Sequence, residues 1–219
     1  RGTAMKMTWV FCLLPLVAAP VLAQDAPPGC TALVTIQSQG CSVRQVFTCE
    51  SDTQPLRWVA SHGPKGPISL TVLDLGGMPQ VMMTGKDKPR GTLDANGDPA
   101  EIEKLMAGET DSFDYKLLFD DGTVLATVGT MVSTGKVVEI DGRSLREFQR
   151  VETINFPNGS TSPEMDNLLL YDPELGLMLN TVSSERATGK VMMDRTPVDF
   201  LFPGEEGADS VIPLYGCEG

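Results

Sequence analysis

The chain has 219 residues, with 17 basic and 29 acidic side chains and a net charge of −12. A surface this acidic repels phosphate backbones and anionic headgroups, which argues against nucleic-acid binding and against membrane adhesion through a basic face. The length is enough for one domain with a substantial core and falls short of two. We therefore expect a single β-rich domain over residues 24–219, preceded by a segment with a different role.

That segment, residues 1–23, has the pattern of a secretory signal peptide. Lys6 supplies a positive charge, an apolar run covers Trp9–Val17, and a small-residue cleavage site ends at Ala23. The run is about half of the ~20 apolar residues that span a bilayer. We predict cleavage near Ala23, a periplasmic or secreted location and no stable membrane anchor. Loss of the two basic leader side chains would change the net charge from −12 to −14.

Four cysteines follow the leader, and an even number in an exported chain indicates two disulfides. If Gln39-Gly40 is a hairpin turn, the facing pairs are Ile36 with Val43, Ala32 with Phe47 and Cys30 with Cys49.

This pairing restricts the disulfides. Cys41 would lie about 26 Å from Cys49 along one strand, whereas a disulfide needs Cα atoms within roughly 7 Å. Cys30 and Cys41 are excluded for the same reason. The expected disulfides are Cys30–Cys49 and Cys41–Cys217.

Short apolar runs broken by Gly, Asp, Asn and Pro about every ten residues are typical of antiparallel β structure. The sequence thus predicts a mainly β fold, an antiparallel meander that forms a half-barrel, a barrel or a sandwich. Beyond the hairpins below, strands are expected at Ile68–Leu75, Val81–Thr84, Asn167–Tyr171, Leu177–Val182, Val191–Asp194 and Val198–Phe202.

One short helix is expected near residues 99–107. Asp98 is a favourable N-cap, Pro99 suits the first helical position and Glu101 completes a capping box. Apolar side chains then recur at helical spacing, and Gly108 can end the helix. The apolar positions are Ile102, Leu105 and Met106.

The dipeptide Asp121-Gly122 favours a two-residue type I′ turn. Pairing across that turn places Phe119 opposite Val124 and collects apolar side chains on one face. We predict an apolar ligand pocket between this face and the helix, lined by Ile102, Leu105, Met106, Phe113, Tyr115, Leu117, Phe119, Val124 and Val128.

Three further turns are predicted by the same chemistry. Asp141-Gly142 joins Val137–Ile140 to a strand that begins at Arg143. Asn158-Gly159 and the segment 172–176 make the next two connections.

No metal, cofactor or catalytic residue can be assigned. The segment Asp94–Asp98 resembles a calcium loop, but Pro99 and Leu105 occupy its key positions, and a turn explains it. The pairs Met82-Met83 and Met192-Met193 point to opposite faces of a strand, so neither converges on a copper ion. Thr-Gly-Lys occurs at Thr84, Thr134 and Thr188, which leaves the question of a repeat open.

The only histidine, His62, is interpreted as a loop residue without a catalytic role. There is no Gly-x-Ser-x-Gly elbow for a serine hydrolase. Acidic pairs such as Asp111/Asp114 could do acid–base work, yet their positions suit solvated carboxylates.

The segments Val198–Gly207, Tyr215-Gly-Cys217 and Thr134–Leu145 resemble a family of bacterial exported proteins to which no activity is attached. More loosely, a long meander with one short helix resembles the half-barrel of periplasmic lipoprotein carriers. The first resemblance implies export and supplies no site residues.

We therefore predict a non-enzymatic periplasmic protein that binds an apolar, lipid-like ligand or a partner protein. The alternative is an envelope assembly factor that docks another protein through a sheet edge or an acidic face. A third possibility is an enzyme that uses carboxylates.

Overall fold

The computed structural model describes residues 26–84 and 89–217, and their mainly β fold confirms the prediction. Thirteen described strands form one antiparallel sheet in the order β12-β11-β10-β9-β8-β7-β6-β5-β4-β3-β2-β1-β13. Their bounds are β1 Cys30–Ser38, β2 Ser42–Cys49, β3 Arg57–Gly63, β4 Gly66–Leu73, β5 Pro79–Met83, β6 Arg90–Leu93, β7 Thr110–Phe119, β8 Val124–Ile140, β9 Arg143–Asn155, β10 Met165–Asp172, β11 Leu177–Glu185, β12 Lys190–Asp194 and β13 Pro197–Leu201.

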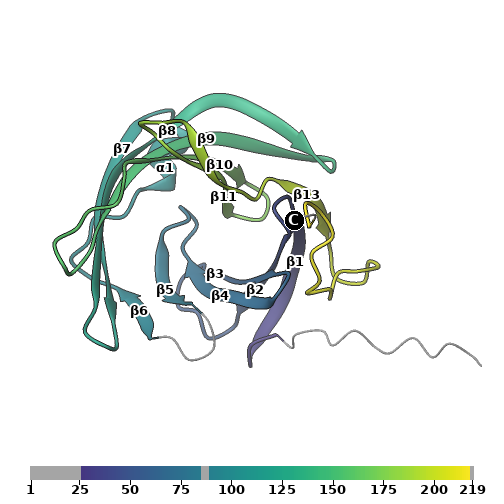
Figure 1. Ribbon diagram of the computed structural model, residues 1–219. Coiled ribbons are helices and arrows are strands. Elements are labelled where there is room, and N and C mark those ends of the chain that lie inside the picture. Colours follow the sequence, from purple (N-terminus) through teal and green to yellow (C-terminus); the bar gives the residue numbers. More distant parts are fainter. Residues whose placement is uncertain (1–25, 85–88, 218–219) are drawn as a thin grey trace, which may run out of the picture.

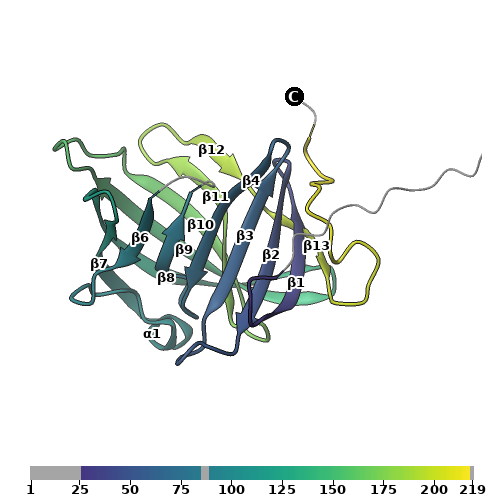
Figure 2. The same ribbon diagram turned by 90° about the horizontal axis from the view of Figure 1, so that it is seen from below.

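The sheet is an open meander that curls on itself. Figure 1 shows β7–β9 on one side of the curl and β2–β5 on the other, and Figure 2 shows β1–β4 side by side. Every strand from β1 to β12 pairs with its neighbours in sequence, but β13 returns to pair with β1. The two edges of the sheet, β12 and β13, therefore follow each other directly along the chain.

Two hydrophobic clusters pack against the sheet, and β10 contributes side chains to both. Leu169 and Tyr171 belong to the first cluster, whereas Leu170, on the opposite face of the strand, belongs to the second. The first cluster includes the helix residues and the inward residues of β7, and the second joins β1–β3 to β9–β11 and β13. Strand β10 is thus buried on both of its faces.

The first hairpin has the predicted turn region but a different register near that turn. Cys30 faces Cys49 and Ala32 faces Phe47, as predicted, but a β-bulge follows between Ala32 and Val34. Beyond the bulge Ile36 faces Arg44, so the predicted Ile36–Val43 pair is wrong. An inserted residue of this kind turns all later side chains of one strand to the other face.

The second hairpin is also shifted by one residue. Leu118, and not Phe119, faces Val124, because Phe119 donates its N–H to the carbonyl of Thr123 across a longer turn. Of the dipeptide Asp121-Gly122, only Gly122 has positive φ, whereas a type I′ turn needs positive φ at both positions.

The later turns are confirmed. Asp141 and Gly142 have φ values of +50° and +72°, and Ile140 faces Arg143 across a two-residue turn. The turn at Gly159 joins β9 to β10, and residues 172–176 lead into β11.

The helix α1 (Ile102–Met106) is shorter than predicted, and its capping differs. Asp98 is not the N-cap, because its backbone N–H and C=O bond to Asp114 at 2.7 and 2.9 Å. The N-cap is Glu101, whose N–H donates to the Asp111 carboxylate at 2.7 Å. Gly108 follows the helix with φ +83°, as expected for a terminating glycine.

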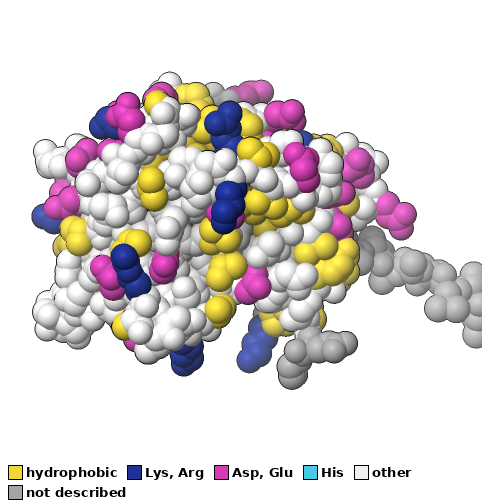
Figure 3. Space-filling view, turned by 90° about the horizontal axis from the view of Figure 1, so that it is seen from above, with side chains coloured by type: hydrophobic (Ala, Val, Ile, Leu, Met, Phe, Trp, Pro, Cys, Tyr) yellow, Lys and Arg dark blue, Asp and Glu magenta, His cyan; other side chains and the backbone are white. Residues whose placement is uncertain are grey.

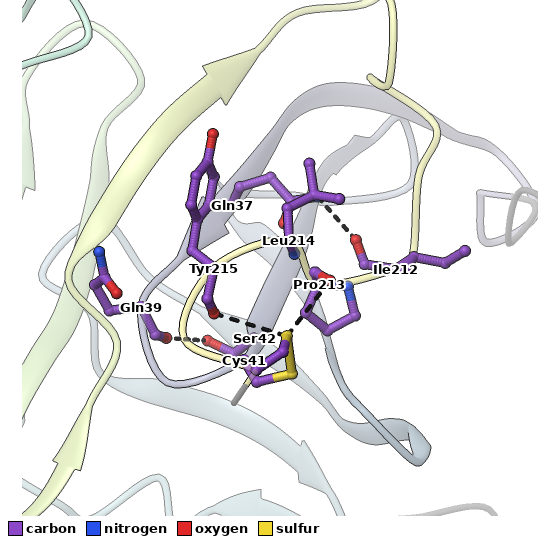
Figure 4. The surroundings of a disulfide bond; sticks show 9 residues. Gln37, Gln39, Cys41, Ser42, Ile212, Pro213, Leu214 and Tyr215 are labelled. Atoms are coloured by element: carbon purple, nitrogen blue, oxygen red, sulfur yellow. Dashed lines mark hydrogen bonds between the residues drawn. A yellow bond between two sulfur atoms is a disulfide. The ribbon is translucent and has the colours of Figure 1, made fainter. Parts of the chain in front are cut away.

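Two disulfides are present, Cys30–Cys49 and Cys41–Cys217. The second fixes the C-terminal segment to the β1–β2 hairpin (Figure 4). Beside it, Cys41 donates its N–H to the carbonyl of Tyr215 at 2.8 Å. Gln37, which is fully buried, binds the backbone of Ile212 and Leu214 at 3.1 Å each. Two disulfides are typical of proteins that fold in an oxidising compartment.

Some sequence features lie elsewhere than expected or outside the described residues. The strands β3 and β6 were not predicted, and the leader with its cleavage site near Ala23 is not among the described residues. Thr134 lies beside a bulge inside β8, whereas Thr188 lies in the β11–β12 turn. These two Thr-Gly-Lys segments therefore differ in structure, and the one at Thr84 runs into residues that are not described.

Candidate binding site

A cavity of about 410 Å³ lies within the curl of the sheet. Its walls come from β2–β5 on one side and from β7–β12 on the other. Apolar side chains make up a large part of the wall, namely Leu73, Met82, Leu117, Leu125, Ile154 and Met193. The volume is within the ~300–1,000 Å³ typical of pockets that enclose small ligands.

The register of the β7–β8 hairpin decides which side chains reach the cavity. Leu117 faces Leu125 and Tyr115 faces Thr127, and all four line the wall. Because side chains alternate along a strand, their neighbours on β8 point outward. Leu125 and Thr127 are therefore cavity residues that the predicted register placed on the wrong face.

Of the nine predicted pocket residues, the structure places only Tyr115 and Leu117 in the cavity wall. Five others pack in the first hydrophobic cluster without lining the cavity, namely Ile102, Leu105, Met106, Phe113 and Phe119. Val124 and Val128 are 37% and 38% exposed on the outer face, so their assignment was wrong. The cavity lies among strands and not beneath the helix, because the helix packs directly on Phe113 and its neighbours.

The cavity wall also carries buried positive charge. Arg44 is 6% exposed and donates from Nη2 to the carbonyls of Asn180 at 3.0 Å and Arg195 at 3.1 Å. Burial and the neighbouring charge of Arg195 lower the pKa of Arg44 to about 10, and burial also lowers the pKa of Arg195. With a pKa of about 10, Arg44 stays protonated near neutral pH.

A second polar group lies on β9. Arg150 and Glu152 form an ion pair at 3.1 Å, with side chains 11% and 12% exposed. Glu152 also accepts a hydrogen bond from Asn167 at 3.0 Å. The Nε atom of Arg150 is buried without a hydrogen-bond partner among the described residues. This pair is neutral as a unit, in contrast to Arg44 and Arg195.

The charged cavity residues were missed at the sequence level. Alternation across Gln39-Gly40 puts Arg44 on the face opposite the apolar residues, but the bulge before Val34 brings Val34 and Ile36 of β1 to the same face of the sheet as Arg44. The available signal was a lone arginine between Val43 and Val46 in an otherwise uncharged strand. A single charged residue in an apolar strand is a reason to test both registers.

His62 is not a loop residue, because it lies in β3 and is 2% exposed. Its burial lowers its pKa, and its Nε2 atom has no hydrogen-bond partner in the described part of the chain. It pairs with Val43, whose side chain is on the face opposite Arg44. His62 therefore takes no part in the cavity.

No group of three or more potential metal ligands occurs within residues 26–84 and 89–217. Asp94 accepts a hydrogen bond from the N–H of Asn96 at 3.1 Å, which is the turn expected for Asp94–Asp98. Met82 and Met193 line the cavity, while Met192 is 58% exposed. The adjacent methionines of the second pair thus lie on different faces of β12.

The outer surface differs from the cavity in its charge. Figure 3 shows acidic and basic side chains scattered over one face without gathering into a single patch. The whole chain carries a charge of −12, whereas the cavity wall holds three arginines and one glutamate. The interior is therefore locally positive inside an acidic protein.

The chain was compared with family models, curated proteins and solved structures, and nothing matches it significantly. None of the helices in the described segments has the length and apolar character needed to cross a bilayer.

Proposed function

We propose that this protein is a non-enzymatic binding protein that encloses an apolar, lipid-like ligand within its curled sheet. The observation that carries the proposal is the cavity of about 410 Å³, whose wall is rich in Leu, Ile and Met side chains. Methionine side chains are flexible and polarisable, which suits a wall that adapts to an acyl chain.

We also propose that the protein works in the periplasm or outside the cell after removal of its leader. The proposal rests on the signal-peptide pattern of residues 1–23 and on two disulfides, Cys30–Cys49 and Cys41–Cys217. The intact mass of the protein recovered from a periplasmic fraction tests it. A cut after Ala23 is expected, and an uncut cytoplasmic protein would contradict it.

The binding function can be tested with a pair of adjacent substitutions on β8. Leu125→Trp places a large ring in the cavity wall, whereas Val124→Trp adds the same ring to the outer face. The wild-type protein should bind a fluorescent fatty acid with at least micromolar affinity, about −8 kcal/mol. Leu125→Trp should weaken binding by about tenfold or more, and Val124→Trp should leave it within about twofold.

Near-ultraviolet circular dichroism confirms that each variant retains its tertiary packing. Equal binding by both folded variants would place the probe outside the cavity, and absence of wild-type binding would reject the proposed function.

A second candidate function is docking of another protein through a sheet edge. It is favoured by β12, an edge strand in which Val191 and Met192 are 57% and 58% exposed. An unpaired strand edge can accept an extended segment of a partner by β-augmentation. Native mass spectrometry of the protein from its own envelope distinguishes the two functions, since one predicts a lipid adduct and the other a protein complex.

A further inference from the structure

We propose that the cavity binds a single-chain anionic amphiphile whose carboxylate or phosphate head lies at Arg44 and Arg195. This inference rests on the proposed binding function and adds the chemical class of the ligand. It starts from two arginines that line one cavity and are joined directly, since Nη2 of Arg44 donates to the carbonyl of Arg195 at 3.1 Å.

These two positive charges lack a counter-ion within the protein. Among the described residues, no carboxylate oxygen lies within 4.0 Å of a guanidinium nitrogen of either arginine, whereas Arg150 in the same wall is paired with Glu152. Arg44 is buried and Arg195 is half-buried, and a buried charge is costly unless it is paired. The carbonyls that Arg44 contacts accept hydrogen bonds but carry no formal charge.

Arg44 connects two parts of the sheet, but this role uses only some of its N–H donors. By binding Asn180 and Arg195, it joins β2 to β11 and to the segment after β12 across the curl. Both hydrogen bonds come from Nη2, while a guanidinium carries five N–H donors. Among the described residues Nη1 and Nε of Arg44 have no hydrogen-bond partner, and a carboxylate or phosphate fits such a planar fork.

The wall beside Arg44 continues the polar end of the cavity. In register across β2, β3 and β4, Arg44 faces Ser61 and Ser61 faces Ser69, and all three line the cavity. Two residues further along these strands, a second row of side chains lines the cavity. In this row Val59 faces Thr71, and Thr71 faces Met82. On this side of the cavity the wall therefore changes from an arginine and two serines to a row with two apolar side chains and one threonine, an order that suits a head followed by a tail.

Three probes with the same chain test the inference: dodecanoate, dodecyl phosphate and dodecanol. Calorimetric titration of the full protein should show both anions binding about tenfold or more tightly than the alcohol, because hydrogen bonds to charged groups are stronger than neutral ones. A preference for the phosphate over the carboxylate would assign a phosphorylated headgroup, and the reverse preference would assign a fatty acid.

Substitutions locate the head. Arg44→Gln and Arg195→Gln should each reduce the ratio of anion affinity to dodecanol affinity severalfold. Arg44→Lys keeps the charge and should retain part of the preference, which a purely structural role would not produce. If Arg44→Gln fails to fold, Arg195→Gln and the three wild-type affinities still decide the matter.

Equal affinity for the three probes, or an anion preference that both glutamine variants retain, would overturn the headgroup assignment and leave the cavity function intact. Failure of all three probes to bind would overturn both proposals.

Discussion

The long strand β8 is bounded by the same dipeptide at both ends, yet the two Asp-Gly turns differ. At Asp141-Gly142 both residues have positive φ, and the turn contains two residues. At Asp121-Gly122 only the glycine has positive φ, and the strands pair again at Leu118 and Val124. Identical turn sequences thus produce registers that differ by one residue.

The surroundings of the two aspartates explain much of the difference. The Asp141 carboxylate accepts the N–H of Phe200 on β13 at 2.8 Å, so a tertiary contact holds this residue in its left-handed conformation. The Asp121 carboxylate accepts the N–H of Thr123 at 2.9 Å, which is a local turn interaction that also lowers the Asp121 pKa. The Asp141 turn is therefore held by a contact with a distant strand, and the Asp121 turn by a hydrogen bond within the turn itself.

The two halves of β8 contribute to different parts of the molecule. The half near Asp121 supplies Leu125 and Thr127 to the cavity, while the half near Asp141 supplies Val138 and Ile140 to the second hydrophobic cluster. A bulge between Ser133 and Val137 separates them. The first half shapes the candidate site, and the second half holds the curl together.

The largest loss of stability is expected near the Asp141 end of β8, where Arg143 forms an ion pair with Asp172. The guanidinium binds the Asp172 carboxylate at 2.9 Å, and that side chain is 1% exposed. Arg143→Met would leave a buried carboxylate without its cation and should cost about 3 kcal/mol. Unfolding in urea measures the loss.

The matched control is Arg186→Met, which breaks the exposed pair with Glu164 and should cost less than about 1 kcal/mol. Equal losses in the two variants would show that the Arg143 pair stabilises the fold no more than an exposed ion pair does.

An intermediate loss of stability is expected at Gly129, in the half of β8 that lines the cavity. A Cβ atom there would collide with the backbone oxygen of Val151 and would lie 2.6 Å from the Phe113 ring. Gly129→Ala should therefore cost about 1–3 kcal/mol in urea unfolding, as overpacking does. Val128→Ala, on the exposed neighbour, should change stability far less. A neutral Gly129→Ala would argue against the observed register.

The smallest loss of stability is expected from substitutions of the aspartates in the two Asp-Gly turns. Asp141→Ala loses the hydrogen bond from Phe200 and puts alanine at φ +50°, so a loss of about 1 kcal/mol is expected. Asp121→Ala should be milder, because that residue is exposed and its φ is not positive. The two urea midpoints, taken with unchanged slopes, give the comparison, and a milder Asp141→Ala would reverse it.

The fold class was predictable because strand periodicity and turn residues are local signals. Gly142 and Gly159 marked real turns, and the rhythm of apolar runs marked most strands. The registers at Phe119 and Ile36 were not predictable, since a three-residue turn and a β-bulge each insert one residue without changing the apolar pattern. Both errors displaced candidate site residues, which is why Arg44 and Leu125 were missed.

In the proposed binding mode, the inner face of the curl holds the tail of the ligand. Photolabelling with dodecanoic acid that carries a diazirine at its chain end, followed by peptide mapping, tests this claim most directly. We expect adducts on inward residues such as Met82, Leu117 and Leu125. Adducts confined to the exposed edge residues Val191 and Met192, or to Val124 and Val128 on the outer face, would contradict it.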